Sequence, residues 1–110
     1  MTVGVVIPCR NEARWLAEVL AALLAQDHRP DEVVVVDDGS VDRTIGVVDD
    51  WRARNEGLAV RVIAGPRRGI AAAVNAGIAV IGTDVVVRLD GHCCPDREYI
   101  GRAVAHLSEP

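Results

Sequence analysis

Four short runs of β-branched and other apolar residues alternate along the chain with four segments whose apolar residues recur at helical spacing. The runs cover residues 3–7, 33–36, 58–63 and 85–89, and their length and composition are typical of buried strands. A helix between two strands supplies the long connection that parallel neighbours need, and such connections are right-handed. The sequence therefore predicts an α/β fold with a Rossmann-like, mainly parallel sheet of about four strands and flanking helices.

The residues around the predicted helices carry signals for their ends. Asn11 and Ser40 precede the first two helical segments and are predicted N-caps. Residues 27–30 are predicted to end the first helix. Because no linker or low-complexity segment divides the 110 residues, we expect residues 1–110 to form one domain.

Composition excludes two classes of partner. A formal net charge of −4 and an aromatic content of 3% argue against nucleic acid, which needs a basic surface and rings for base stacking. The apolar runs are far shorter than the ~20 residues that span a bilayer. The cysteine count is three, and two of these residues are adjacent, which suits a reducing compartment. We expect a cytoplasmic protein, although a full-length form could associate with a membrane.

Polar residues gather where the predicted strands end, at residues 10–12, 37–40 and 90–92. Parallel α/β sheets bind ligands beyond the carboxyl ends of their strands, so these clusters indicate one site. The alternative is ordinary turn chemistry, because Asp, Asn, Gly and Ser occur in any strand-to-helix turn.

Two carboxylates, Asp37 and Asp38, follow four consecutive valines. One of them can accept the imide N–H of a uracil or an amino group of another base, and Gly39 allows a ligand close to the backbone. The alternative is a capped turn in which Asp38 only favours the helix N-terminus.

Arg67 and Arg68 lie in a glycine-flanked loop that opens the third predicted helix, a setting suited to phosphate. Neither the P-loop nor the dinucleotide-binding glycine motif is present. Solvated surface arginines are the alternative interpretation.

Asp90 and His92 follow the fourth predicted strand and can place a carboxylate oxygen and an imidazole nitrogen on one Mn²⁺ or Mg²⁺ ion. The ion would bridge diphosphate oxygens, and oxygens of the ligand would complete its coordination. Zinc is an alternative, with His92, Cys93 and Cys94, and Cys9 from a neighbouring strand end, as soft ligands.

The motifs at residues 5–12, 36–44, 68–77 and 89–92 together resemble those of the family-two glycosyltransferases of the A-type fold. Their order and spacing match, and they extend over nearly all of the chain. The Asp-x-His form of the last motif, at Asp90 and His92, resembles the branch that includes bacterial exopolysaccharide enzymes of the succinoglycan type.

This resemblance implies a nucleotide-sugar donor, with a UDP-sugar expected. It places two groups of residues around the base and ribose, with Asp38 contacting the base: Pro8, Arg10 and Glu12, and Asp37 to Ser40. Arg67 or Arg68 would lie near the base or diphosphate. Asp90 would meet the ribose and metal, and His92 would ligate the metal.

The resemblance also implies inverting transfer by direct displacement, with a carboxylate from a later half of the domain as base. Residues 1–110 are then expected to be the donor-binding half, without the acceptor half and with no catalytic residue of their own. Asp96 and Glu98 suit the start of the last helix better than the role of base. An acceptor glycan or lipid-linked sugar is expected only for a full-length form.

Two other classes compete with this interpretation. A phospho-acceptor receiver domain matches the length and the paired aspartates, but its site needs a lysine, and this chain has none. A non-catalytic module that self-associates through an uncovered sheet edge is compatible with donor binding. We therefore also expect that the chain can form a homo-oligomer through this edge.

Overall fold

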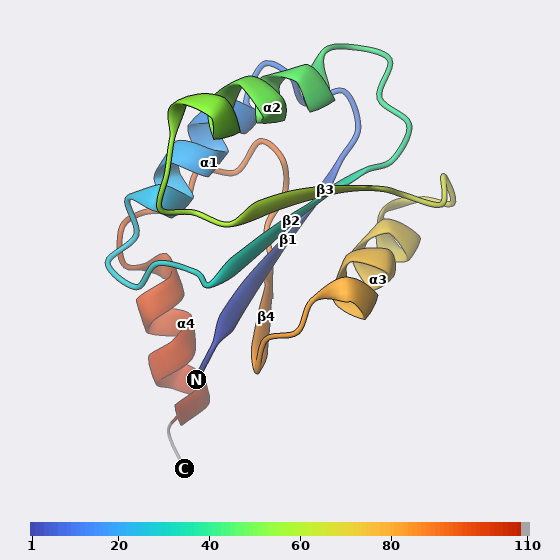
Figure 1. Ribbon diagram of the computed structural model, residues 1–110. Helices are drawn as coiled ribbons and strands as arrows, with labels where there is room; N and C mark the ends of the chain where they lie inside the picture. The colour runs from blue at the N-terminus through green and yellow to red at the C-terminus, as the bar shows by residue number, and fades with distance from the viewer. Residues whose placement is uncertain (109–110) are drawn as a thin grey trace.

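The computed structural model describes residues 1–108 as an open sheet with helices on both faces (Figure 1). The elements in chain order are β1 (Val3–Cys9), α1 (Leu16–Leu24), β2 (Glu32–Asp37), α2 (Thr44–Arg54), β3 (Val60–Ala64), α3 (Ile70–Val80), β4 (Val85–Arg88) and α4 (Tyr99–Ser108). The sheet has the order β3-β2-β1-β4, and every neighbouring pair is parallel. The predicted α/β class, strand number and parallel direction are confirmed.

The connections explain why the helices divide between two faces. The chain steps outward from β1 to β2 and β3 through α1 and α2, and then returns through α3 to place β4 on the other side of β1. A right-handed return must cross the opposite face. Accordingly, α1, α2 and α4 lie on one face and α3 on the other (Figure 1).

The alternating side chains of the two central strands form two apolar layers. Odd-numbered residues of β1 and β2, such as Val5 and Val33, pack with α1, α2 and Ile100 of α4. Even-numbered residues, such as Val6 and Val34, pack with Ala73 of α3. Every residue of β1 is buried, because the strand is central and covered on both faces.

Strand β1 continues through Pro8 to Cys9, beyond the predicted range of residues 3–7. Pro8 pairs with Val36 of β2, and its missing N–H faces the β4 side, where the pairing ends at Val6 and Arg88. The Leu89 N–H still donates to the Val6 carbonyl oxygen at 3.0 Å, and the next bond on that side would require the N–H that Pro8 lacks, so pairing with β4 ends at the proline. In the edge strands, β3 starts at Val60, later than predicted, and β4 ends at Arg88, one residue earlier.

The two predicted N-caps are wrong. Helix α1 starts at Leu16 and α2 at Thr44, and neither has a side-chain cap at its N-cap residue. Asn11 and Ser40 bond to each other's loops instead: Ser40 Oγ accepts the Asn11 N–H at 2.9 Å, and Asn11 Oδ1 accepts the Val41 N–H at 2.8 Å. These long-range bonds tie the first two loops together.

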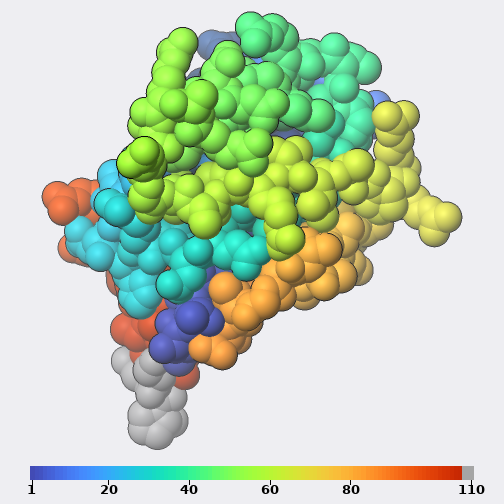
Figure 2. Space-filling model, in the orientation of Figure 1, coloured from blue at the N-terminus to red at the C-terminus, as the bar shows by residue number. Residues whose placement is uncertain are grey.

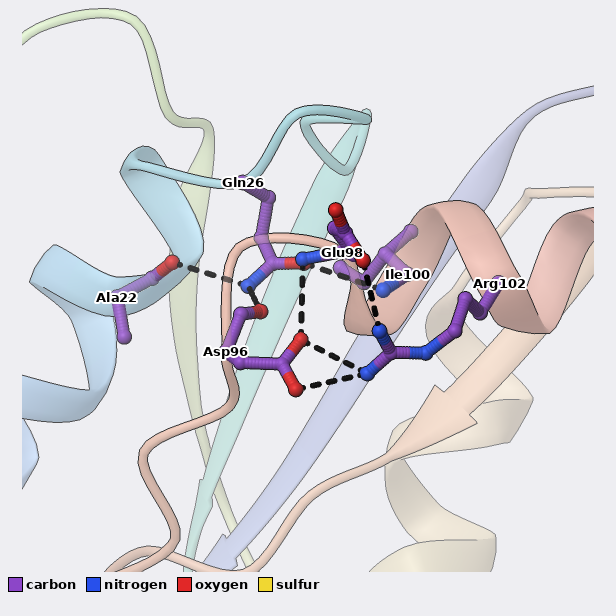
Figure 3. A network of polar contacts seen from close by, with 6 residues as sticks. All are labelled: Ala22, Gln26, Asp96, Glu98, Ile100 and Arg102. Carbon is purple, nitrogen blue, oxygen red and sulfur yellow. Dashed lines mark hydrogen bonds and ion pairs between the residues drawn. The ribbon is translucent and has the colours of Figure 1, made fainter.

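A buried glutamine anchors α4 to the end of α1 (Figure 3). Gln26 is 5% exposed, its amide group donates to the carbonyl oxygens of Ala22 and Asp96, and its Oε1 accepts the Ile100 N–H at 3.1 Å. Arg102 holds the Asp96 carboxylate at 2.7 Å beside this network. The anchor fixes the far end of the loop that joins β4 to α4. Among residues 1–108, no helix is both long and apolar enough to cross a membrane.

Candidate functional site

The main cavity lies at the carboxyl ends of the strands, where the strand order reverses between β1 and β4. Its volume is about 610 Å³, within the ~300–1,000 Å³ typical of small-molecule sites. The loops after β1, β2 and β4 and the start of α3 contribute its walls. Open α/β sheets bind ligands at such a reversal because the adjacent loops diverge to opposite faces there.

Seven of the nine predicted site residues line this cavity: Pro8, Arg10, Glu12, Asp38, Arg67, Asp90 and His92. Asp37 and Arg68 are not among its lining residues. Several lining residues were not predicted as site residues. They are Cys9, Gly69, Ile70, Ala73 and Arg88.

The paired aspartates have different surroundings. Asp37 lies at the end of β2, and its Oδ1 accepts the Ser40 N–H at 3.3 Å, so it stabilises its own turn. Asp38 reaches into the cavity, and its Oδ1 accepts the Arg67 N–H at 2.7 Å. Asp38 therefore shapes the pocket by holding the loop between β3 and α3, a role that the sequence did not predict.

The loop between β3 and α3 is built for close approach to Asp38. A Cβ on Gly65 would lie 2.5 Å from Asp38 Oδ1, so only glycine fits there. Arg67 has a φ of 59°, and its side chain lies over Gly39, where an added Cβ would be 3.0 Å from Nε. The segment, drawn in yellow, projects from the body of the molecule (Figure 2).

At the other end of the cavity, the loop after β4 meets the loop after β1. His92 Nδ1 lies 3.2 Å from Glu12 Oε1, within hydrogen-bond distance. Gly91 is buried against the residues that follow β1, and a Cβ on Gly91 would be 2.8 Å from Glu12 Cγ. Arg88 pairs with Asp90 Oδ1 at 3.4 Å. The side chains of Asp90 and His92 are 50% and 61% exposed, so both are accessible to a ligand.

Within residues 1–108, no three histidine, cysteine or acidic side chains are grouped to hold a metal ion. The zinc alternative is therefore not supported. Cys9 is buried, and its thiol faces the Ile7 carbonyl oxygen at 3.6 Å, whereas Cys93 and Cys94 are exposed. Burial, with a smaller contribution from Glu12, raises the pKa of Cys9 to about 12.

Asp96 and Glu98, the two acidic residues weighed for the role of base, lie directly before α4 and outside the cavity lining. Both pair with Arg102, Asp96 at 2.7 Å and Glu98 at 3.0 Å. The hydrogen bond from Arg102 lowers the pKa of Asp96 below its ordinary value. Both carboxylates are thus engaged in ion pairs with α4 and do not face the cavity.

Fold and cavity together define an α/β domain of the class that binds its ligand at a reversal of strand order. The chain belongs to glycosyl transferase family 2, whose family model matches residues 4–110. The family predicted from the four motifs is thereby confirmed.

Sequence relatives and solved structures agree with this assignment. The glycosyltransferase AglE of Haloferax volcanii is 32% identical over 108 residues, which are 96% of this chain and 35% of that protein. The mannosyltransferase PcManGT of Pyrobaculum calidifontis, solved with GDP-Man and Mn²⁺, is 34% identical with a TM-score of 0.90, over 98% of this chain and 32% of that one.

The S. aureus protein TarS, solved with UDP-GlcNAc, is 28% identical with a TM-score of 0.82. The alignment covers 97% of this chain and 31% of the solved TarS chain, which comprises residues 1–349 of TarS. The chain thus spans about a third of the length of the relatives it matches.

Proposed function

We propose that this chain is the donor-binding part of an inverting glycosyltransferase and that it holds a nucleoside diphosphate sugar in the cavity between β1 and β4. One observation carries the proposal: the loops after β2, β3 and β4 bring Asp38, Arg67, Asp90 and His92 into one cavity of about 610 Å³. These side chains supply the hydrogen-bond acceptor, cation and metal ligands that such a donor requires.

The base and ribose occupy the end of the cavity formed by the loops after β1 and β2. Pro8 and Arg10 form one side of this end, and Asp38 accepts a hydrogen bond from the base while it holds the loop of Arg67. Glu12, from the same loop as Arg10, lies at the metal end beside His92. Gly39 has a φ of 88° and no side chain, which allows the Arg67 side chain to pack closely over it at this end of the cavity.

The diphosphate must be bound mainly by side chains. In many nucleotide sites the loop after the first strand offers free N–H groups to phosphate. Here the N–H groups of Asn11, Glu12 and Ala13 already donate to side chains of the next loop. Arg10 and Arg67 line the cavity and are exposed, so they are the cations that we assign to the diphosphate.

The residues at the other end suit a divalent ion bound mainly through the ligand. Glu12 faces Nδ1 of His92, an arrangement in which a carboxylate orients a histidine so that Nε2 is left to a metal. Asp90 supplies a carboxylate, and Mn²⁺ or Mg²⁺ commonly takes few protein ligands together with phosphate oxygens. When bound, the ion offsets the negative charge that develops on the leaving nucleoside diphosphate. The Mn²⁺ in the mannosyltransferase structure supports this assignment.

A UDP-sugar is our proposed donor, and a glycan or lipid-linked sugar is our proposed acceptor for the whole protein. TarS was solved with UDP-GlcNAc and the mannosyltransferase with GDP-Man, so GDP is the competing nucleotide in the test. We assign no catalytic base within this chain.

Calorimetric titration of the chain with UDP, GDP and dTDP, with and without Mn²⁺, tests the proposal. We expect UDP to bind most tightly and Mn²⁺ to strengthen the binding. Asp38→Ala should weaken it about tenfold or more, because a hydrogen bond to a charged group is worth ~1.5–3 kcal/mol. His92→Ala should remove the effect of Mn²⁺.

His106→Ala is the matched control for His92, because His106 is an exposed histidine of α4 outside the cavity lining. It should bind nucleotide as the unaltered chain does. Absence of binding to all three nucleotides, with and without Mn²⁺, would refute the donor site.

A further inference from the structure

Three successive backbone N–H groups after β1 each donate to a side chain of residues 40–44, which comprise the loop after β2 and the first residue of α2. The bonds run from Asn11 to Ser40 Oγ (2.9 Å), from Glu12 to Thr44 Oγ1 (3.0 Å) and from Ala13 to Asp42 Oδ2 (3.2 Å). We name the three acceptor residues, Ser40, Asp42 and Thr44, the loop clasp. Because three adjacent residues are fixed at once, the path of the chain after β1 depends on the loop clasp.

Thr44 is the buried centre of the loop clasp. It is 0% exposed, and its hydroxyl both accepts the Glu12 N–H and donates to Asp42 Oδ1. The same carboxylate oxygen accepts the Thr44 N–H at 3.0 Å. Both hydrogen-bonding functions of the hydroxyl are therefore used, and a side chain of the same shape without the hydroxyl leaves the part-buried Glu12 N–H without this acceptor.

The loop clasp also holds a backbone conformation that the chain would otherwise avoid. Asn11 has a φ of 57°, in the left-handed region where non-glycine residues are uncommon. The Asn11 N–H donates to Ser40 Oγ, and Asn11 Oδ1 accepts the Val41 N–H. These contacts allow the chain to turn sharply directly before Glu12.

Glu12 links the loop clasp to the metal end of the cavity. Its side chain is 19% exposed and points to His92, with Oε1 at 3.2 Å from Nδ1. Gly91 packs against Glu12 so closely that a Cβ there would lie 2.8 Å from Glu12 Cγ. A displacement of the Glu12 backbone must therefore move the carboxylate that faces His92.

We propose that Thr44 and Asp42 are positioning residues of the donor pocket: through the backbone of residues 11–13 they place Glu12, and Glu12 orients His92. The proposal rests on the proposed function for its ligand, whereas the contacts themselves are properties of this chain. Partners that orient a metal-binding histidine typically change metal affinity ~10–100-fold when they are lost.

Thr44→Val and Thr44→Ser form the test pair, because only serine keeps the hydroxyl. In Thr44→Val we expect the His92 ring signals to shift in NMR spectra and hydrogen exchange at the Glu12 amide to accelerate. The strengthening of UDP binding by Mn²⁺ should fall about tenfold, while affinity without Mn²⁺ changes much less. Thr44→Ser should restore all three readouts. Asp42→Asn serves as the second variant if Thr44→Val does not fold.

Asp84→Asn is the matched control. Asp84 also accepts two hydrogen bonds from one threonine, from the N–H of Thr2 at 2.9 Å and from its hydroxyl at 3.1 Å. This pair lies at the amino ends of β1 and β4, away from the cavity. This variant should leave the His92 signals unmoved, and the rings of His28 and His106 provide internal references.

Unmoved His92 signals in both Thr44→Val and Asp42→Asn would overturn the proposal. So would an equal loss of nucleotide affinity with and without Mn²⁺, since that result indicates a merely structural role. If the unaltered chain binds no nucleotide, the proposed function fails, and the His92 and Glu12 signals alone decide whether the loop clasp positions the histidine.

Discussion

At the scale of residues, the cavity concentrates backbone conformations that ordinary side chains avoid. Among residues 1–108, Asn11 and Arg67 are the non-glycine residues with positive φ, and both lie in loops that form the cavity. Each such conformation costs ~1–3 kcal/mol and persists only where neighbouring contacts enforce it. Here those contacts come from Ser40 and Asp38. Local strain is thus placed where the loops are shaped for a ligand.

Cys9 should resist modification in the folded protein. Its pKa is raised to about 12 by burial, so it stays protonated at pH 8, whereas Cys93 and Cys94 are exposed. Iodoacetamide at pH 8 should label Cys93 and Cys94 first and Cys9 only after unfolding in guanidinium, as mass spectrometry of the digested chain will show. Labelling of Cys9 in the folded chain at the rate of Cys93 would contradict its burial.

The same shift has a consequence for stability. The folded pKa of the Cys9 thiol lies above the ordinary value of 9.0. The folded state favours the protonated thiol, because the buried site disfavours the thiolate. The stability that this preference provides is therefore fully present below pH 9 and is lost as the pH rises toward 12.

Residue types near the cavity could be predicted, but their partners could not. Asp38, Asp90 and His92 follow apolar runs, and the topology of parallel sheets brings such positions to one edge. The bond between Asn11 and Ser40 spans 29 residues, and capping rules consider only local partners, so both residues were assigned to the wrong role. The role of Asp38 as acceptor for the Arg67 N–H depends on the path of a loop that apolar periodicity does not describe.

At the scale of elements, the junction of α1 with α4 depends on one buried side chain (Figure 3). Gln26→Leu should lower the free energy of unfolding by about 2 kcal/mol or more, because the Ile100 N–H and the Asp96 carbonyl oxygen lose their partner. Urea denaturation followed by circular dichroism measures this change.

The neighbouring Asp27→Asn provides the comparison for Gln26→Leu. It removes the exposed ion pair between Asp27 and Arg97, which is 2.9 Å long, and such pairs contribute ~0–1 kcal/mol. An equal loss of stability in both variants would contradict the anchoring role of Gln26.

The sequence predicted the existence of every element better than its ends. The periodicity of β1 is clear, but a proline normally ends a strand. That Pro8 continues the strand follows only from the length of β4, whose pairing with β1 stops at Arg88. Glycine at position 91 is likewise explained only in three dimensions, by its contact with Glu12 and Cys9.

At the scale of the whole molecule, the position of the cavity follows from the strand order. Apolar runs predict a parallel sheet but do not specify neighbours, so the order β3-β2-β1-β4 required the structure. The return of the chain through α3 creates the reversal between β1 and β4, and the polar loop ends converge there. Residues 4–110, which the family model matches, include every residue that lines this cavity.

An NMR titration of the ¹⁵N-labelled chain with UDP, in the presence of the diamagnetic ion Mg²⁺, tests most directly that this edge binds the donor. We predict that the amide signals of Gly39, Arg67 and Gly91 shift together. Those of Gly82 and Asp84, at the amino ends of the strands, should stay in place. Shifts confined to α4 or to the amino ends of the strands, or no shifts with either UDP or GDP, would contradict a donor site between β1 and β4.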